Sequence, residues 1–172
     1  MYKKKICMLG SYGVGKTSLV ARFVSSKFSE SYQSNVGVKV DEKLVTVDGE
    51  EVKLILWDLA GEEEGAPIRL NQLRDAAGYL LVADGTRGQS LETARSIQER
   101  AENTVGRRPF LLLVNKADLR ESWEIQESAW QELADAGWTI LKTSAKSGAH
   151  VEEAFLTLTS RMLKPQAEDD DD

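Results

Sequence analysis

The sequence of 172 residues has little of the chemistry on which several classes of protein depend: it contains one cysteine, one histidine and three prolines. The lone cysteine, Cys7, cannot form an internal disulfide, so we expect a buried thiol and a reducing compartment, the cytoplasm. One histidine cannot build a metal site from several imidazoles, and we expect His150 at the surface, near the start of the last helix. No apolar run reaches the roughly 18 residues that predict a membrane-spanning helix.

Positive charge is also scarce, with 22 Lys and Arg against 28 Asp and Glu, a net charge of −6. Nucleic-acid binding requires a basic surface, so we expect no nucleic-acid partner. The N-terminus, MYKKKICMLG, has a short apolar stretch that leads directly into a glycine-rich motif. This pattern predicts a first strand and not a secretory signal. We expect one domain over residues 1–164 and a disordered acidic tail at 165–172.

Short apolar runs alternate with amphipathic helical stretches, a pattern typical of an α/β protein with a parallel sheet and helices on both faces. Within residues 38–58, Asp48 and Gly49 separate two alternating runs, which predicts a hairpin and hence one antiparallel strand. The polar segment 26–37 has no periodicity and predicts a long, functional loop. The other predicted strands are 4–9, 78–84, 109–115 and 138–144, and the predicted helices are 16–25, 90–104, 122–136 and 150–163.

The strongest motif is GSYGVGKT at residues 10–17, which we call the phosphate loop. It matches G-x-x-x-x-G-K-[ST] between a predicted strand and a predicted helix, the context that supports phosphate binding. Glycines allow successive backbone N–H groups to face phosphate oxygens, and the helix N-terminus adds positive potential. Lys16 is then expected to reach the β- and γ-phosphates, and the hydroxyl of Thr17 to ligate Mg²⁺.

A second motif, NKAD at residues 115–118, follows a late strand. The carboxylate of Asp118 can accept hydrogen bonds from both the ring N–H and the exocyclic amine of guanine. Adenine offers no such pair of donors, so a buried acceptor there would be left unsatisfied. The motif therefore predicts selection of guanine.

Two further motifs follow strands. In DLAG, residues 58–61, Asp58 is expected to hold Mg²⁺ through a water molecule, and the N–H of Gly61 to meet a γ-phosphate. In TSAK, residues 143–146, a backbone N–H can face the guanine carbonyl.

The order and spacing of these four motifs resemble the Ras superfamily of small GTPases, and the Rab-like branch most of all, from about residue 3 to residue 163. The resemblance implies a three-layer G-domain fold with a six-stranded, mostly parallel sheet. It also implies two switches, residues 26–40 and 60–75, that bind effectors, exchange factors and activating proteins according to the nucleotide. By the same likeness Phe28 stacks near the guanine and Lys116 packs along it. The implied nucleotide-binding set is Gly13, Val14, Gly15, Lys16, Thr17, Ser18, Phe28, Asn115, Lys116, Asp118, Ser144, Ala145 and Lys146.

Three residues depart from the family pattern, and each bears on hydrolysis or switching. Asn35 stands where a threonine ligates Mg²⁺, and its amide oxygen can take that place, so the expected metal set is Thr17, Asn35 and Asp58. Tyr12 is bulky where the family has a small residue. Glu62 replaces the glutamine that orients the attacking water, so the expected catalytic residues are Glu62, Lys16 and Gly61.

A glutamate at position 62 raises a specific difficulty, because its charge opposes the charge that develops on the γ-phosphate. It can protonate, pair with a cation such as Arg69 or Arg74, or point away until a partner binds. We therefore expect slow intrinsic hydrolysis. Two alternatives stay open: a GTP-binding scaffold with little useful hydrolysis, and a small P-loop kinase.

The last part of the sequence has no cysteine after Cys7, and it ends in AEDDDD. Prenylation requires a cysteine near the C-terminus, and acidic residues are repelled by anionic lipid. We therefore expect no stable lipid anchor. Elsewhere, Trp123 and Trp130 are seven residues apart in the predicted helix 122–136, which predicts that they pack into the core on one helix face.

Overall fold

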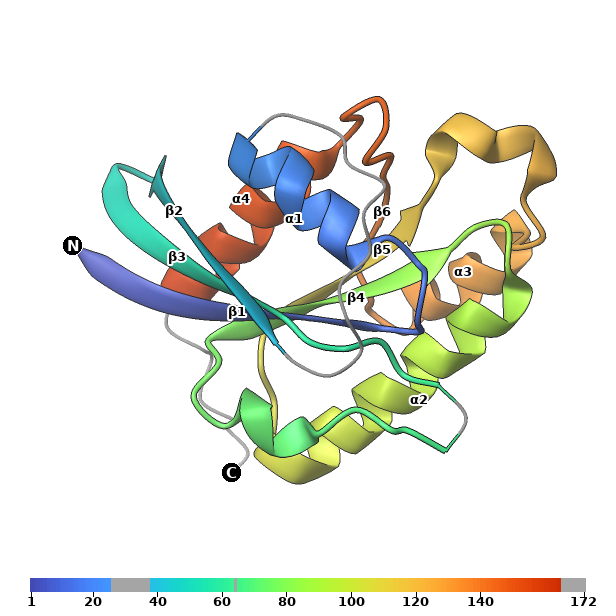
Figure 1. The fold of residues 1–172 in the computed structure, drawn as a ribbon, viewed down its shortest axis with the longest axis horizontal. Coiled ribbons are helices and arrows are strands. Elements are labelled where there is room, and N and C mark those ends of the chain that lie inside the picture. Colours follow the sequence, from blue (N-terminus) through green and yellow to red (C-terminus); the bar gives the residue numbers. More distant parts are fainter. Residues whose placement is uncertain (26–37, 64, 165–172) are drawn as a thin grey trace.

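The computed structural model describes residues 1–25, 38–63 and 65–164, and within them a twisted sheet of six strands lies between two layers of helices (Figure 1). The strands are β1 (Tyr2–Gly10), β2 (Lys39–Val47), β3 (Glu50–Asp58), β4 (Gly78–Asp84), β5 (Phe110–Asn115) and β6 (Ile140–Lys142). The α-helices are α1 (Lys16–Ser25), α2 (Gly88–Val105), α3 (Glu127–Asp135) and α4 (Val151–Leu163), and the 3₁₀ helices are η1 (Leu70–Leu73) and η2 (Ala117–Ser122). None of these described helices is long and apolar enough to cross a membrane.

The strands lie in the order β2-β3-β1-β4-β5-β6, and only β2 runs antiparallel to its neighbour. This confirms the predicted α/β fold, with the hairpin turn at Asp48 and Gly49. The carboxyl ends of parallel strands meet at one edge of a sheet. Gly10, Asp58, Asp84 and Asn115 end β1, β3, β4 and β5, so the four strand ends that carry polar motifs lie along the same edge.

Each face of the sheet has its own apolar core. Helices α1 and α4 cover one face, where the rings of Phe23 and Phe155 stack with centroids 4.1 Å apart. Helices α2 and α3 cover the other, around Tyr79, Ile97 and Trp130. Cys7 is fully buried in this second core, as predicted, and burial raises the pKa of its thiol to about 12.

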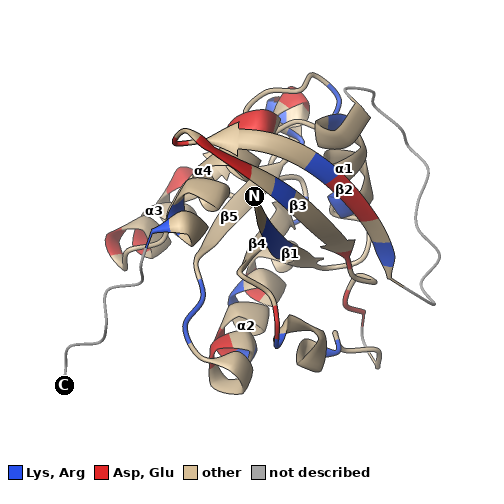
Figure 2. Ribbon diagram, turned by 90° about the vertical axis from the view of Figure 1, so that its left-hand side faces the viewer, with Lys and Arg blue, Asp and Glu red and all other residues tan. Residues whose placement is uncertain are grey.

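Charged residues of both signs are mixed along the β2–β3 hairpin, as the coloured ribbon shows (Figure 2). Lys53 of β3, for example, pairs with Glu42 of β2 at 3.1 Å.

The predicted helix 122–136 is wrong over its first five residues, 122–126. Residues 117–122 form η2, Trp123 is extended, and α3 begins only at Glu127. Tertiary contacts set this geometry: the Trp123 indole N–H donates to the Lys116 carbonyl at 2.8 Å, and two backbone N–H groups of the following residues donate to the Gly85 carbonyl. Trp123 and Trp130 do pack together, with centroids 5.7 Å apart and rings nearly perpendicular, but not on one helix face.

Candidate functional site

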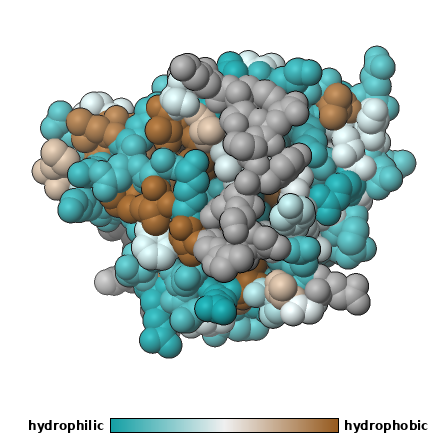
Figure 3. Space-filling model, in the orientation of Figure 1, coloured by the Kyte–Doolittle hydropathy of each residue, from teal (hydrophilic) through white to brown (hydrophobic). Residues whose placement is uncertain are grey.

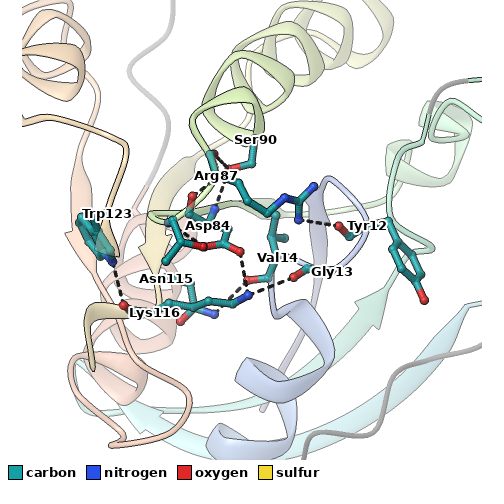
Figure 4. Close-up of polar contacts among 10 residues, drawn as sticks. Tyr12, Gly13, Val14, Asp84, Arg87, Ser90, Asn115, Lys116 and Trp123 are labelled. Atoms are coloured by element: carbon teal, nitrogen blue, oxygen red, sulfur yellow. Dashed lines mark hydrogen bonds and ion pairs between the residues drawn. The ribbon is translucent and has the colours of Figure 1, made fainter. Parts of the chain in front are cut away.

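The phosphate loop joins β1 to α1, and side chains from the ends of β4 and β5 hold its carbonyl groups (Figure 4). Arg87 Nη1 donates to the Tyr12 carbonyl at 2.9 Å, Lys116 Nζ reaches the Gly13 carbonyl at 3.5 Å, and Asn115 Nδ2 donates to the Val14 carbonyl at 3.0 Å. In a trans peptide the C=O and N–H groups point in opposite directions. Three successive N–H groups therefore face away from these side chains.

Those N–H groups belong to Gly13, Val14 and Gly15. Within the part of the chain that the structure describes, they donate to no backbone or side-chain acceptor. Backbone N–H groups in proteins are nearly always hydrogen-bonded, so three consecutive donors in a loop before a helix form a concave anion-binding surface.

Lys16 and Thr17 sit at the start of α1. Lys16 is 5% exposed and donates to the Ser11 carbonyl at 3.2 Å. Burial lowers the pKa of Lys16 to about 8, with the nearby Asp58 carboxylate acting in the opposite direction. The Thr17 hydroxyl donates to Asp58 Oδ2 at 2.6 Å, and burial raises the pKa of Asp58. Lys16, Thr17 and Asp58, three of the expected phosphate and metal side chains, are thus brought together.

The NKAD and TSAK motifs form a second cluster beside the phosphate loop. The Thr143 hydroxyl donates to the side-chain oxygen of Asn115 at 3.1 Å, and the Ser144 hydroxyl donates to Asp118 at 2.7 Å. Ser144 is buried and Asp118 is exposed. Ala145 is buried, Lys146 is exposed, and Arg22 of α1 donates to the Lys146 carbonyl at 3.1 Å. The two motifs therefore contact each other, and the Asp118 carboxylate is exposed to solvent.

The second switch, residues 60–75, rests on the phosphate loop through its backbone. Tyr12 N–H donates to the Glu62 carbonyl at 3.1 Å, and Glu62 N–H donates to the Gly10 carbonyl at 2.9 Å. Gly61 has to be glycine for this approach, because a Cβ there would lie 2.5 Å from the Tyr12 Cα and 2.9 Å from Lys16 Nζ. The contact places Gly61 directly against Lys16.

The side chain of Glu62 turns to α2 instead. Its Oε2 accepts from Arg100 Nη2 at 2.7 Å, and its Oε1 accepts from the Ile68 N–H at 3.1 Å. Of the three expected possibilities for Glu62, the structure shows pairing with a cation, but the cation is Arg100 and not Arg69 or Arg74, because α2 packs beside this loop. The pair is partly buried, with side chains 17% and 33% exposed.

Three residues of the site were not anticipated from the sequence. Asp84 is fully buried and pairs with Lys116 at 2.7 Å, so Lys116 is held between β4 and the phosphate loop. Arg87 reaches the site from the position just before α2, and Arg100 from within α2. Of the three, only Asp84 has a signal in the sequence that could have indicated it, because it is a carboxylate at the end of an apolar strand. Phe28 and Asn35 lie outside the described residues, as does most of the first switch.

The motifs, their order along the sheet edge and the phosphate loop together match one known group of proteins. A family model described as the Ras family matches residues 5–164. The chain belongs to the Ras family. It is similar to human Ras-related protein Rab-8B, with 37% identity over 167 residues that cover 94% of this chain and 79% of the relative. Ras-related protein Rab-8 of Diplobatis ommata is 37% identical over 94% of this chain and 78% of its own length, and dog Rab-13 is 37% identical over 92% and 79%.

These relatives confirm the Rab-like assignment made from the motifs. As a member of this family, the protein is a GTP-binding switch that hydrolyses GTP, and it has regulatory and effector partners. The scaffold and kinase alternatives gain no support from the comparisons.

Proposed function

We propose that the nucleotide phosphates bind the N–H groups of residues 13–18 together with the ammonium of Lys16, and that the protein binds and hydrolyses GTP at this site. The observation that carries the proposal is the row of three N–H groups, from Gly13 to Gly15, that donate to no acceptor among residues 1–25, 38–63 and 65–164. The buried Lys16 supports it, because a desolvated ammonium gains most from an anion placed beside it.

Guanine is assigned to the cluster of Asn115, Lys116, Asp118, Ser144, Ala145 and Lys146, with Phe28 as an expected stacking partner outside the described residues. The Asp118 carboxylate is exposed and already ordered by the Ser144 hydroxyl at 2.7 Å. An ordered acceptor at the surface binds a donor pair with little loss of conformational entropy.

Magnesium fits Thr17 and Asp58. Their oxygens lie 2.6 Å apart beside Lys16, and Mg²⁺ in such sites takes one or two protein oxygens and completes its shell with phosphate oxygens and water. Within the described residues there is no cluster of three or more His, Cys, Asp and Glu that could hold a metal ion. When bound, the ion neutralises charge on the β- and γ-phosphates. Asn35 stays a predicted third ligand.

Glu62 is proposed to limit hydrolysis. A glutamine can accept from the attacking water and donate to the γ-phosphate, whereas a carboxylate only accepts and repels the developing charge. The ion pair with Arg100 keeps both Glu62 oxygens engaged at α2 and Ile68, and a Glu62 side chain that leaves Arg100 for the γ-phosphate brings its full negative charge there. Intrinsic hydrolysis is therefore slow, and a protein that supplies a cation accelerates it.

Partners are proposed to dock on the two switches. Val40, at the end of the first switch, is 48% exposed, and Leu44 on the same face of β2 is 56% exposed. In the space-filling view, apolar residues gather among polar ones over this part of the sheet (Figure 3). Exposed apolar side chains rimmed by polar ones are typical of protein-binding surfaces.

The test of base recognition is Asp118→Asn, with Asp135→Asn on the exposed surface of α3 as a matched control. Losing the charged acceptor should weaken GTP binding by about a hundredfold. Binding of xanthosine triphosphate should rise, because its extra carbonyl accepts from the new amide. Affinities of both nucleotides are measured by competition with fluorescent GDP. Unchanged GTP affinity and selectivity in Asp118→Asn would show that the guanine site lies elsewhere.

A further inference from the structure

The turn between β4 and α2 carries Arg87, which reaches the Tyr12 carbonyl of the phosphate loop (Figure 4). Its Nη1 donates to the Tyr12 carbonyl at 2.9 Å, and a Cβ added to Gly13 would lie 3.5 Å from the same nitrogen. The guanidinium therefore lies against the peptide that joins Tyr12 to Gly13, on the side of its carbonyl group.

The backbone of Arg87 is fixed on both sides. Its N–H donates to the Asp84 carbonyl at 2.9 Å, and its own carbonyl accepts from the Ser90 N–H at 3.0 Å and from the Ser90 hydroxyl at 2.6 Å. Asp84 and Ser90 are both buried. The arginine thus projects from a rigid point, which lowers the entropic cost of holding its side chain on the loop.

The contact has a direct consequence for the Gly13 N–H. Since the peptide is trans, a carbonyl that points to Arg87 leaves the N–H pointing the opposite way, and a cation on the carbonyl oxygen polarises the whole peptide group. Arg87 also brings a full positive charge beside the loop. Lys116 and Asn115 hold the next two carbonyls but leave this peptide to Arg87.

We infer that Arg87 is a positioning residue for the nucleotide phosphates: it orients the Gly13 N–H and adds positive potential, and so slows release of GDP and GTP. The inference rests on the proposed function, in which this N–H binds a phosphate oxygen. The chain thereby supplies from its own α2 turn a cation at the phosphate loop besides Lys16 and Lys116.

The experiment measures dissociation of fluorescent GDP and GTP from the full chain at low and high salt. Arg87→Ala should release both nucleotides about fivefold faster at low salt, the size of an exposed charge-assisted hydrogen bond. The difference from the parent should shrink at high salt, because exposed charges are screened. Arg87→Lys keeps the charge and should restore most of the slow release. Arg95→Ala removes an arginine further along α2 and should leave release unchanged.

An NMR measurement distinguishes a change in the orientation of the Gly13 N–H from a loss of protein stability. In the GDP complex of ¹⁵N-labelled protein, the Gly13 amide proton should move upfield in Arg87→Ala, because its hydrogen bond to phosphate weakens. The free energy of unfolding is measured for each variant, and Arg87→Gln replaces Arg87→Ala if the alanine variant folds poorly.

Two results would overturn the inference while leaving the phosphate site intact: release from Arg87→Ala that matches Arg95→Ala, or faster release that neither depends on salt nor is restored by lysine. Lys16→Ala is measured alongside. If it too leaves nucleotide binding unchanged, the proposed phosphate site itself fails, and the role of Arg87 fails with it.

Discussion

The phosphate loop and the second switch meet at the same edge of the sheet, yet they are held in different ways. Three successive carbonyls of the phosphate loop are anchored by side chains from the ends of β4 and β5. The second switch has a backbone contact at Glu62, one ion pair to Arg100, and a tie from Lys5 to Gln72 and Asp75. Between these points Glu63, Gly65, Ala66 and Pro67 are exposed.

This contrast matches what a nucleotide switch requires. A loop anchored to buried strand ends keeps its shape whichever nucleotide is bound, so it can provide constant affinity. Ile68 and Leu73 anchor the later part of the second switch in the core, whereas residues 62–63 and 65–67 are held by a few partly exposed polar contacts. That earlier part changes conformation at low cost, since each such contact contributes only about 1 kcal/mol. The following predictions test the contrast, beginning with the largest effect.

Lys16→Ala should have the largest effect, because it removes the buried charge that the rigid loop presents to the phosphates. We expect affinity for both GDP and GTP to fall by roughly two orders of magnitude. Thr17→Asn should instead weaken the GTP–Mg²⁺ complex more than the GDP complex, because it alters the metal ligand. Titration with each nucleotide, with and without Mg²⁺, distinguishes the two. Equal, small losses in both variants would contradict the assignment of the phosphate loop.

Glu62→Gln should change the rate of chemistry but not binding. Removing the opposing charge and adding a donor should raise single-turnover GTP hydrolysis at neutral pH by at least about tenfold. The matched control is Glu63→Gln, on the exposed neighbour. If the parent is fast unaided and Glu62→Gln is slower, Glu62 works as a base or holds the water, and the repulsion argument is wrong.

Arg100→Ala should loosen the second switch alone. When Arg100 is removed, the Glu62 side chain that accepts from the Ile68 N–H is no longer held by an ion pair. Exchange of the Ile68 amide should therefore accelerate by about fivefold, as expected for loss of roughly 1 kcal/mol. Amides of residues 13–15 in the GDP complex should keep their protection. In a Glu62→Gln background the same substitution should add little, because the pair is already broken. An equal effect of Arg100→Ala in both backgrounds would show that the ion pair does not hold this loop.

The smallest effect is expected at Cys7, in the strand that carries the phosphate loop. Its thiol is fully buried and its pKa is raised to about 12, so at pH 8 the reactive thiolate is scarce. Labelling by a thiol reagent should occur only on global unfolding and should be the same in the parent and in Arg100→Ala. Faster labelling of Cys7 in Arg100→Ala would mean that the core around β1 opens together with the second switch.

Much of the site could be predicted from the sequence, because it consists of local motifs that follow the strands of a regular parallel sheet. Apolar runs set the strands, and each motif follows a strand, so a parallel sheet has to bring residues 10–17, 58–61 and 115–118 to one edge. The hairpin at Asp48 and Gly49 was predictable for the same reason, since the signal lies in adjacent residues.

The prediction was wrong where a long-range contact overrides local preference. Trp123 lies in a stretch with helical periodicity, but its indole is drawn to the Lys116 carbonyl and its ring packs over Gly85, where a Cβ would lie 2.2 Å from it. As a result η2 ends at Ser122, and α3 begins only at Glu127 and not at the predicted residue 122. Periodicity cannot show such a contact, because the partners are specified by the path of the chain.

The sequence by itself determined the sheet, the motifs at its edge and the family, since these depend on apolar patterning and on glycines and polar residues at fixed spacing. Only the tertiary structure decided which cation neutralises Glu62 and which side chain holds Tyr12. Those partners, Arg100 and Arg87, are 38 and 75 residues away along the chain; Arg100 is half-buried on α2, and Arg87 is exposed on the turn before it. Several arginines satisfied the charge requirement equally well in the sequence, and the packing of α2 beside the two loops selected between them.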